Sequence, residues 1–481
     1  MNRRNRRDFL KSGIAATLGT GMYAQMIPRL SAQSQDDPAQ VTPENSLPPQ
    51  GNPIIPGRGV CDPHIRVFDG TFYMYATHDY SPENRFFRMD NWWVWHSDDL
   101  VHWNLASILK PEETFVRKPL DECWATDAGT RDGKYYFYFS AGPKQIGVVT
   151  GDTPAGPWKD PLGKPLIPEG LTPTQERDPG ILMDDDGSNY IVFGTMDYYI
   201  AKLNDDMISL AEAPRLIHFD REYGPYGEGK VDDKPYLHKR NGVYYLSWGC
   251  FYAMGSSPYG PFYYKGSVID QLNTAPDFRT ENLVHDRHGS FFQFHGQWYF
   301  VCNDQSQKGS QRFFRNSILS YVHYCDNGEI APVKISSVGV GRYDASLGRI
   351  EAEDFFKIAG GQVRECPMGG FEVRGLANGS LLFYPNVQNI PSRAKVILRL
   401  SSEANGTGKI EIHESNAEGK LLGSAAIPNS KAWDKYVDVS VPIATDRQML
   451  NLAFIFRGKG SELARLNFWK IVAEDAEPAK A

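Results

Sequence analysis

Three aspartates in similar settings have the clearest capacity for chemistry in this sequence. Asp62 and Asp178 each precede a proline, and Asp233 stands two residues before Pro235. Carboxylates act as general acids and bases when several of them are brought into one site. A single aspartate before proline is typical of an ordinary turn, so these three point to catalysis only if the fold makes them converge.

A repeat along the chain predicts that convergence. Five times an apolar segment runs into a turn that ends in glycine, and a tyrosine follows at the third position after that glycine. The turn glycines are spaced 54 to 63 residues apart and are Gly70, Gly133, Gly187, Gly242 and Gly296. The Asp-Gly and Asn-Gly turns among them supply the positive φ that two-residue hairpins need. Units of this length hold about four strands each and cannot bury a core alone, which predicts an all-β fold, a five-bladed β-propeller over residues 53–335.

The innermost strand of each blade faces the central channel, so equivalent positions of the five blades meet there. Eight or nine residues before the turn glycines, where each inner strand begins, stand Asp62, Trp124, Asp178, Asp233 and His288. Three blades thus offer a carboxylate at matching register. This pattern favours an enzyme over a protein that only binds a ligand.

Four short motifs lie in these units. They are Asp-Pro-His-Ile-Arg (62–66), Arg-Asp-Pro-Gly-Ile-Leu (177–182), Asp-Asp-Asp-Gly (184–187) and His-Lys-Arg-Asn-Gly-Val-Tyr-Tyr-Leu (238–246). Together they resemble glycoside hydrolase family 43. The resemblance implies a five-bladed propeller that uses an aspartate base, a second aspartate that tunes the pKa of the acid, and a glutamate acid.

By this resemblance Asp62 is the general base, and Asp178 raises the pKa of the acid and orients it. The register that holds the family's glutamate is occupied here by Asp233, which we expect to be the acid. Glu228, in the glycine-rich loop 223–230, is the alternative. An inverting glycosidase places its acid and base about 6.5–9.5 Å apart.

The resemblance also implies contacts to substrate and metal. Arg315 matches a family arginine that reaches the sugar hydroxyls, and His288 matches a histidine that contacts a hydrated, chiefly structural calcium ion. Trp93 and Trp124 are candidate platforms on which a sugar ring could stack. A tryptophan of a propeller can equally pack between blades.

From residue 349 the glycine–tyrosine repeat stops and segments of alternating polarity begin, for example at residues 394–400. This change predicts a second domain over residues 349–475, a β-sandwich of the jelly-roll, galactose-binding-like type.

The motifs at residues 350–355 and 465–469 resemble a family 6 carbohydrate-binding module. The resemblance implies that Glu351 and Glu353 help to hold a structural calcium ion. The closing motif here begins Arg-Leu-Asn, whereas the family usually has Asn-Leu-Asp. Sugar binding and a packing role for this domain therefore both stay open.

The first 32 residues resemble a twin-arginine export signal, because Arg6 and Arg7 precede a weakly apolar run over residues 12–27. Residues 33–52 are polar and proline-rich, as in a flexible linker. We therefore expect an exported bacterial protein, periplasmic or secreted.

Composition excludes several kinds of partner. The net charge is −7 and no basic block lies beyond the first eleven residues, which argues against nucleic acid. No stretch approaches the ~18 unbroken apolar residues of a membrane span, so no integral membrane segment is expected in the mature chain. The six cysteines lack zinc-site spacing and are expected to be buried free thiols. An oligo- or polysaccharide is the expected substrate.

These features predict an exported, inverting exo-glycosidase that hydrolyses O-glycosyl bonds in plant polysaccharide side chains, of the α-L-arabinofuranosidase or β-xylosidase type. The alternatives are a non-catalytic glycan-binding propeller and an exo-galactosidase or galactofuranosidase of the same fold. The motifs do not fix the sugar, because loop contacts distinguish arabinose, xylose and galactose.

Overall fold

The described part of the chain consists almost entirely of β-strands and turns. The computed structural model describes residues 51–219, 233–269, 287–304, 312–404 and 408–474. Within these ranges the helical segments are the short 3₁₀ turns η3 (Pro111–Glu113), η4 (Gly142–Lys144) and η6 (Ala345–Leu347). No helix in the described ranges has the length and apolar character needed to cross a membrane.

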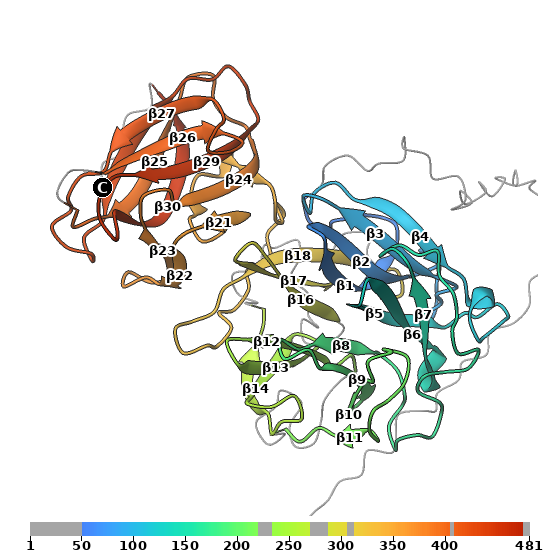
Figure 1. The fold of residues 1–481 in the computed structure, drawn as a ribbon. Coiled ribbons are helices and arrows are strands. Elements are labelled where there is room, and N and C mark those ends of the chain that lie inside the picture. The colour runs from blue at the N-terminus through green and yellow to red at the C-terminus, as the bar shows by residue number, and fades with distance from the viewer. Residues whose placement is uncertain (1–50, 220–232, 270–286, 305–311, 405–407, 475–481) are drawn as a thin grey trace, which may run out of the picture. The chain divides into compact units, whose positions relative to one another are not determined.

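Five antiparallel sheets follow one another along the chain, and Figure 1 shows them around a common centre. The first holds β1 (Val60–Phe68), β2 (Thr71–His78), β3 (Trp92–Ser97) and β4 (Asn104–Leu109). The second holds β5 (Cys123–Arg131), β6 (Lys134–Ala141) and β7 (Ile146–Gly151), and the third β8 (Gly180–Met183), β9 (Asn189–Thr195), β10 (Asp197–Lys202) and β11 (Arg215–Leu216). The fourth holds β12 (Tyr236–Arg240), β13 (Val243–Trp248), β14 (Phe251–Gly255) and β15 (Tyr263–Ser267), and the fifth β16 (Gly289–Phe294), β17 (Gln297–Asp304) and β18 (Asn316–Val322).

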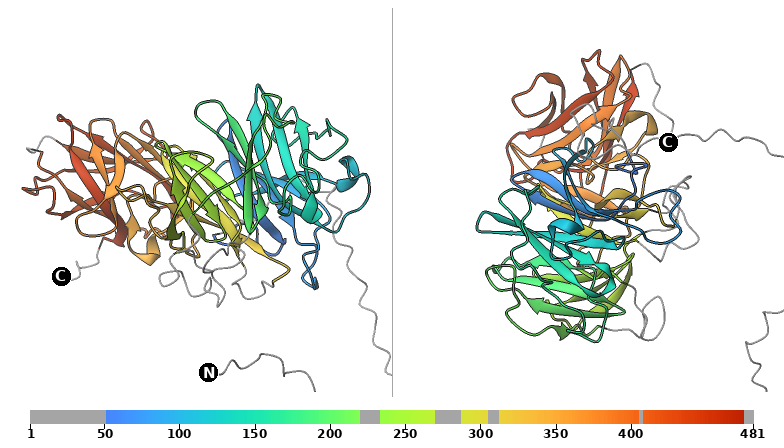
Figure 2. Two further views of the ribbon diagram at one scale, coloured as in Figure 1. Left: turned by 90° about the horizontal axis from the view of Figure 1, so that it is seen from below. Right: turned by 90° about the vertical axis from the view of Figure 1, so that its right-hand side faces the viewer.

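The first strand of each sheet is its innermost one. β1, β5, β8, β12 and β16 each pack against the inner strand of the next sheet, and β16 packs against β1. Aromatic side chains fill the space between neighbouring sheets; the rings of Phe72 and Phe292, for example, lie 6.0 Å apart between the first and fifth. The sheets are therefore the blades of the expected five-bladed propeller, and Figure 2 gives two further views of them.

Four of the five repeated turns have the predicted conformation. Asp69 and Gly70, for example, have φ of 50° and 84°, and the turns before β6, β13 and β17 repeat this pair of positive angles. The third turn differs, because five residues connect Met183 to Asn189, the last pair of the β8–β9 ladder. Only its Gly187 has positive φ. The expectation of a two-residue hairpin is wrong for this blade.

Residues 343–473 form two facing sheets, the expected β-sandwich. One sheet holds β19 (Tyr343–Asp344), β21 (Lys357–Ala359), β24 (Leu381–Gln388), β26 (Lys409–Glu414), β27 (Leu421–Ala426) and β29 (Leu450–Arg457). The other holds β20 (Ile350–Glu351), β22 (Gln362–Glu365), β23 (Phe371–Leu376), β25 (Ala394–Ser401), β28 (Val437–Ile443) and β30 (Ala464–Ala473). Inward-facing residues such as Leu398, Phe454 and Trp469 are fully buried between them.

All six cysteines are free thiols. Five of them are buried, and Cys325 is half-buried. Burial raises the pKa of Cys302 to about 12, which keeps that thiol protonated and unreactive. The expectation of free thiols is confirmed, with Cys325 less enclosed than predicted.

Candidate active site

Asp62 lies in a bulge of β1, between the paired residues Cys61 and His64. Its φ is 48°, a left-handed conformation that turns the side chain out of the regular strand pattern. The side chain is buried, and its Oδ1 accepts hydrogen bonds from Asn303 at 2.7 Å and from Arg315 at 3.1 Å. The bulge thus directs one carboxylate toward donors from the fifth blade.

The charge state of Asp62 follows from these neighbours. Burial opposes ionisation, but the charges of Arg315 and His288 outweigh it and hold the pKa of Asp62 well below its ordinary value. His288 Nδ1 lies 2.8 Å from Asp62 Oδ1. Asp62 is therefore ionised at neutral pH, as a general base must be.

Asp178 precedes β8 and has left-handed φ of 58°. Its backbone N–H donates to Ser140 Oγ at 2.8 Å, but its buried Oδ2 has no hydrogen-bond partner among the described residues. Arg177 Nε lies 3.7 Å from that oxygen. Burial, opposed by Arg177 and reinforced by the charge of Asp233, raises the pKa of Asp178 to about 6.

Asp233 precedes β12 and is ion-paired on both oxygens. Its Oδ2 accepts from Arg177 Nη2 at 3.1 Å, and its Oδ1 contacts His288 Nε2. Burial opposes ionisation, but His288 and Arg177 together lower the pKa of Asp233 to about 2. The expected electrostatics are therefore reversed, because Asp178, rather than Asp233, has the raised pKa. The assignment of Asp233 as the acid stays a prediction, and Glu228 lies outside the described residues.

His288 joins two of the predicted catalytic carboxylates. Its Nδ1 faces Asp62 and its Nε2 faces Asp233, so a protonated ring donates to both. Burial disfavours the charge, but Asp233 and Asp62 raise the pKa of His288 well above its ordinary value. Neither ring nitrogen is left for a metal or its water shell, so this geometry does not fit the expected calcium contact.

Arg315 is held within the protein rather than pointed at a ligand. It is buried, its Nε lies 3.0 Å from Asp79 Oδ2, and its Nη2 lies 3.0 Å from Asp79 Oδ1. This two-point contact fixes the guanidinium that donates to Asp62. In this arrangement Arg315 orients the base, and its contact to sugar hydroxyls stays a prediction.

The two predicted tryptophan platforms differ. Trp124, at the start of β5, is half-buried, and the Arg177 guanidinium lies 5.1 Å from its ring centre. Trp93 is 6% exposed and stacks on His78 at 3.9 Å. Trp93 therefore packs inside the first blade, which disfavours its expected role as a sugar platform, and that role stays a prediction. Trp124 remains a candidate beside Arg177.

Several residues of the site were not predicted from sequence. Lys234, beside Asp233, is 1% exposed and donates to the backbone oxygen of Asp62 at 3.1 Å. Asp127 accepts from Arg66 Nε at 2.9 Å. Lys234 directly follows Asp233, which was located by counting back from the turn glycine, so the same count could have identified Lys234. Asp127, four positions into β5, carries no comparable signal. We call Asp62, Asp178, Asp233, Lys234 and His288 the inner-strand cluster.

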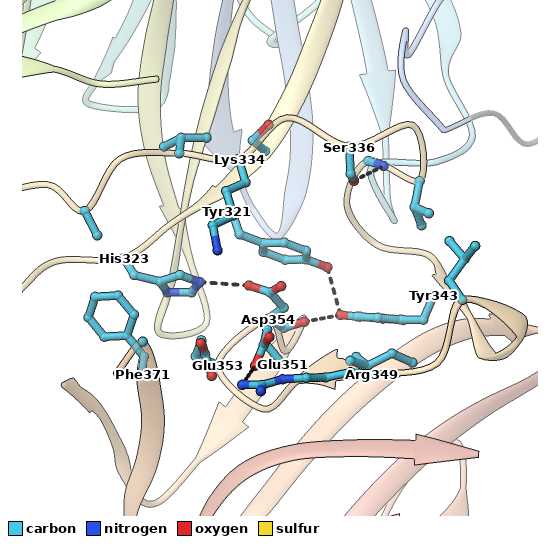
Figure 3. A pocket seen from close by; sticks show the side chains of 18 of the residues that line it. Tyr321, His323, Lys334, Ser336, Tyr343, Arg349, Glu351, Glu353, Asp354 and Phe371 are labelled. Atoms are coloured by element: carbon cyan, nitrogen blue, oxygen red, sulfur yellow. Dashed lines mark hydrogen bonds and ion pairs between the residues drawn. The ribbon is translucent and has the colours of Figure 1, made fainter. Parts of the chain in front are cut away.

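The two glutamates expected to bind calcium line a separate cavity of about 780 Å³, shown in Figure 3. Glu351 Oε2 accepts from Arg349 at 2.6 Å, and Asp354 contacts His323 at 2.8 Å. Glu353 is buried and its Oε2 has no hydrogen-bond partner among the described residues. Burial, with the charges of Asp354 and Glu351, raises the pKa of Glu353 well above its ordinary value. An orphaned carboxylate oxygen fits calcium, although the described residues contain no group of three or more metal-ligating side chains.

Comparison with known proteins agrees with both domains. A family model described as glycosyl hydrolases family 43 matches residues 50–330, and one described as carbohydrate binding module (family 6) matches residues 351–473. An arabinoxylan arabinofuranohydrolase of Paenibacillus polymyxa is 26% identical over 94% of this chain and 78% of its own length.

Two solved structures have a similar fold. A family 43 arabinoxylan arabinofuranohydrolase from Bacillus subtilis, in complex with cellotetraose, has a TM-score of 0.53 at 23% identity and covers 88% of this chain and 97% of its own. A β-xylosidase/α-arabinofuranosidase from a compost microbial metagenome, in complex with xylotriose and described as calcium-free, has a TM-score of 0.51 at 27% identity. It covers 60% of this chain and 98% of its own.

Proposed function

The chain belongs to glycosyl hydrolases family 43 and is a glycoside hydrolase, and from this premise we propose that it is an inverting, exo-acting arabinofuranosidase or xylosidase of plant polysaccharide side chains. The observation that carries the proposal is the meeting of Asp62 and Asp233 on the two nitrogens of His288. The imidazole ring lies between the two carboxylates and keeps them apart. An inverting mechanism requires such a separation, because a water molecule must fit between the base and the sugar.

Asp62 is the base in this proposal. It is ionised, and donors from Asn303, Arg315 and His288 fix its Oδ1. As a water oxygen attacks the anomeric carbon, Asp62 takes the proton that water loses, while the leaving oxygen receives a proton from the acid on the opposite face.

The acid proton is held by the pair Asp178 and Asp233. The charge of Asp233 helps to raise the pKa of Asp178 to about 6, so Asp178 holds a proton near that pH beside the ionised Asp233. Register supports Asp233 as the residue that delivers this proton, and Glu228 remains the alternative donor.

A second candidate function is a propeller that binds glycans without cleaving them. One observation favours it: both oxygens of Asp233 are engaged by cations, which holds this carboxylate ionised. An ionised group cannot protonate a leaving oxygen.

Hydrolysis of a panel of nitrophenyl glycosides and of arabinoxylan tests the proposal, with proton NMR of the first-formed sugar. We expect cleavage of α-L-arabinofuranosides or β-D-xylosides with inversion at the anomeric carbon. A retained anomer would refute the mechanism. Binding of arabinoxylan with no hydrolysis of any substrate would favour the non-catalytic propeller.

The remaining parts of the chain complete the proposal. Residues 1–32 direct export to the periplasm or medium, residues 33–52 are a linker, and residues 53–335 and 349–475 are the two domains. The sandwich contacts saccharide or packs on the enzyme. It holds a structural calcium ion through Glu353, supported by the unpartnered, buried Oε2 of that residue.

A further inference from the structure

Lys234 occupies a position that is unfavourable for a lysine in two respects. Its side chain is 1% exposed, and burial of an ammonium group without compensating charge is strongly disfavoured. Its φ is 59°, a left-handed conformation that residues other than glycine rarely adopt. A lysine under both constraints requires a compensating interaction in the folded chain.

That compensation comes from the carboxylates around it. Nζ donates to the backbone oxygen of Asp62 at 3.1 Å, its one hydrogen bond within the described ranges. The charge of Lys234 also interacts with Asp62, Asp178, Asp127 and Asp233, but burial outweighs them and lowers the pKa of Lys234, so they compensate its burial only in part. A single ammonium group therefore faces carboxylates contributed by four blades.

Each of the other carboxylates of this buried region lies in an ion pair, and Asp62 and Asp233 share His288. The pairs are Asp79 with Arg315, Asp127 with Arg66, Asp233 with Arg177, and Asp62 with His288. Asp178 lacks a hydrogen bond on Oδ2, and Arg177, the nearest cation, is already bonded to Asp233. Lys234 adds to the positive charge that Arg177 and His288 place near Asp178. Without it the region would hold one uncompensated negative charge when Asp178 is ionised.

A hydrated calcium ion beside His288 would have to share this space. Both nitrogens of His288 are directed at carboxylates, and the Asp62 carbonyl, an oxygen of the kind calcium prefers, already accepts from Lys234. A divalent ion would also be repelled by the Lys234 ammonium. The donor set therefore does not fit a metal at this position.

We propose that the Lys234 ammonium is the built-in cation of the inner-strand cluster, which holds the base Asp62 through its backbone and makes the propeller's activity independent of calcium. Lys234 is a positioning residue in this proposal, which rests on the proposed function only in naming Asp62 as the base.

The first experiment measures metal dependence in the full chain. The double variant Glu351→Gln, Glu353→Gln removes the expected sandwich site, so any remaining calcium belongs elsewhere. Before any chelator is added, we expect elemental analysis to find no stoichiometric calcium. After dialysis against EDTA, added calcium should change neither the unfolding temperature nor turnover. One calcium ion per chain whose removal lowers turnover or the unfolding temperature would overturn the proposal.

The second experiment removes the ammonium. Lys234→Gly suits the positive φ, and we expect turnover to fall roughly 100-fold with little change in KM, as for loss of one buried electrostatic contact at an active site. Butylammonium added in solution should restore part of the turnover and raise the unfolding temperature of Lys234→Gly. It should do neither for Lys234→Met, whose uncharged chain fills the space.

Lys239→Met is the matched control. Lys239 lies in the same blade and pairs with Asp184 at 2.6 Å, outside the inner-strand cluster. We expect its loss to leave turnover unchanged. Parent-like turnover of Lys234→Gly, or an equal response of both Lys234 variants to butylammonium, would refute the role. If the parent chain cleaves no glycoside, the proposed function is refuted. The metal content and the unfolding temperatures of the variants still test whether the Lys234 ammonium serves as the cation of the inner-strand cluster.

Discussion

Replacing Asp178 by asparagine should stabilise the fold at alkaline pH while it impairs catalysis. Burial raises the pKa of Asp178 from 3.8 to about 6, so the folded chain disfavours its ionised form. Stability from this group is fully present below pH 3.8 and is lost as the pH rises through about 6. The difference between the two pKa values corresponds to about 3 kcal/mol. A neutral asparagine does not incur that loss.

Urea unfolding of the propeller, followed by tryptophan fluorescence, measures the effect. We expect the free energy of unfolding of Asp178→Asn to exceed that of the parent by up to about 3 kcal/mol at pH 8, and by about half as much at pH 5. A variant less stable than the parent at pH 8, or an excess that does not depend on pH, would refute the reasoning.

Asp233→Asn is the matched control, because it should change the free energy of unfolding at pH 8 in the opposite direction. His288 and Arg177 overcome burial and lower the pKa of Asp233 to about 2, so this group contributes stability above pH 3.8 that is lost as the pH falls toward about 2. Its replacement should destabilise the fold at pH 8 by about 2 kcal/mol. Two neighbouring aspartates thus give opposite changes in one assay.

Three further outcomes are expected. Asp62→Asn should keep the fold, checked by circular dichroism, and lower turnover by about 10²–10⁴-fold; parent-like activity would exclude Asp62 as the base. Asp233→Ala should slow substrates with poor leaving groups and spare activated aryl glycosides. The same leaving-group dependence in Glu228→Ala, with Asp233→Ala still active on natural linkages, would assign the acid to Glu228. Glu353→Gln should abolish any rise of the sandwich's unfolding temperature with calcium, and an undiminished rise would place calcium elsewhere.

The blades and the position of the inner-strand cluster could be predicted from the sequence, because the repeated turns show the length of each blade and where each inner strand begins. Counting from the turn glycines found Asp62, Asp178, Asp233 and His288, and these do meet. Their charge states could not be predicted this way. They depend on partners such as Arg315, which reaches Asp62 across 253 positions of the chain.

The sequence also did not show which of the two candidate tryptophans is buried. Trp93 and Trp124 carry the same aromatic signal, and only the packing of Trp93 on His78 distinguishes them. The predicted two-residue turn of the third blade was also wrong, because an Asp-Gly pair is compatible with more than one turn length.

The left-handed backbone at Asp62 and Asp178 has a consequence for mutational scanning. Among residues with a side chain, asparagine and aspartate tolerate this conformation best, whereas β-branched residues are strongly disfavoured. In a saturation library sorted for soluble expression, asparagine and glycine should be enriched at both positions and valine, isoleucine and threonine depleted, with no substrate present. The residues accepted at these two sites are therefore limited both by the backbone conformation and by the need for a carboxylate. Exchange of aspartate for asparagine separates the two effects, because asparagine tolerates the conformation but lacks the carboxylate.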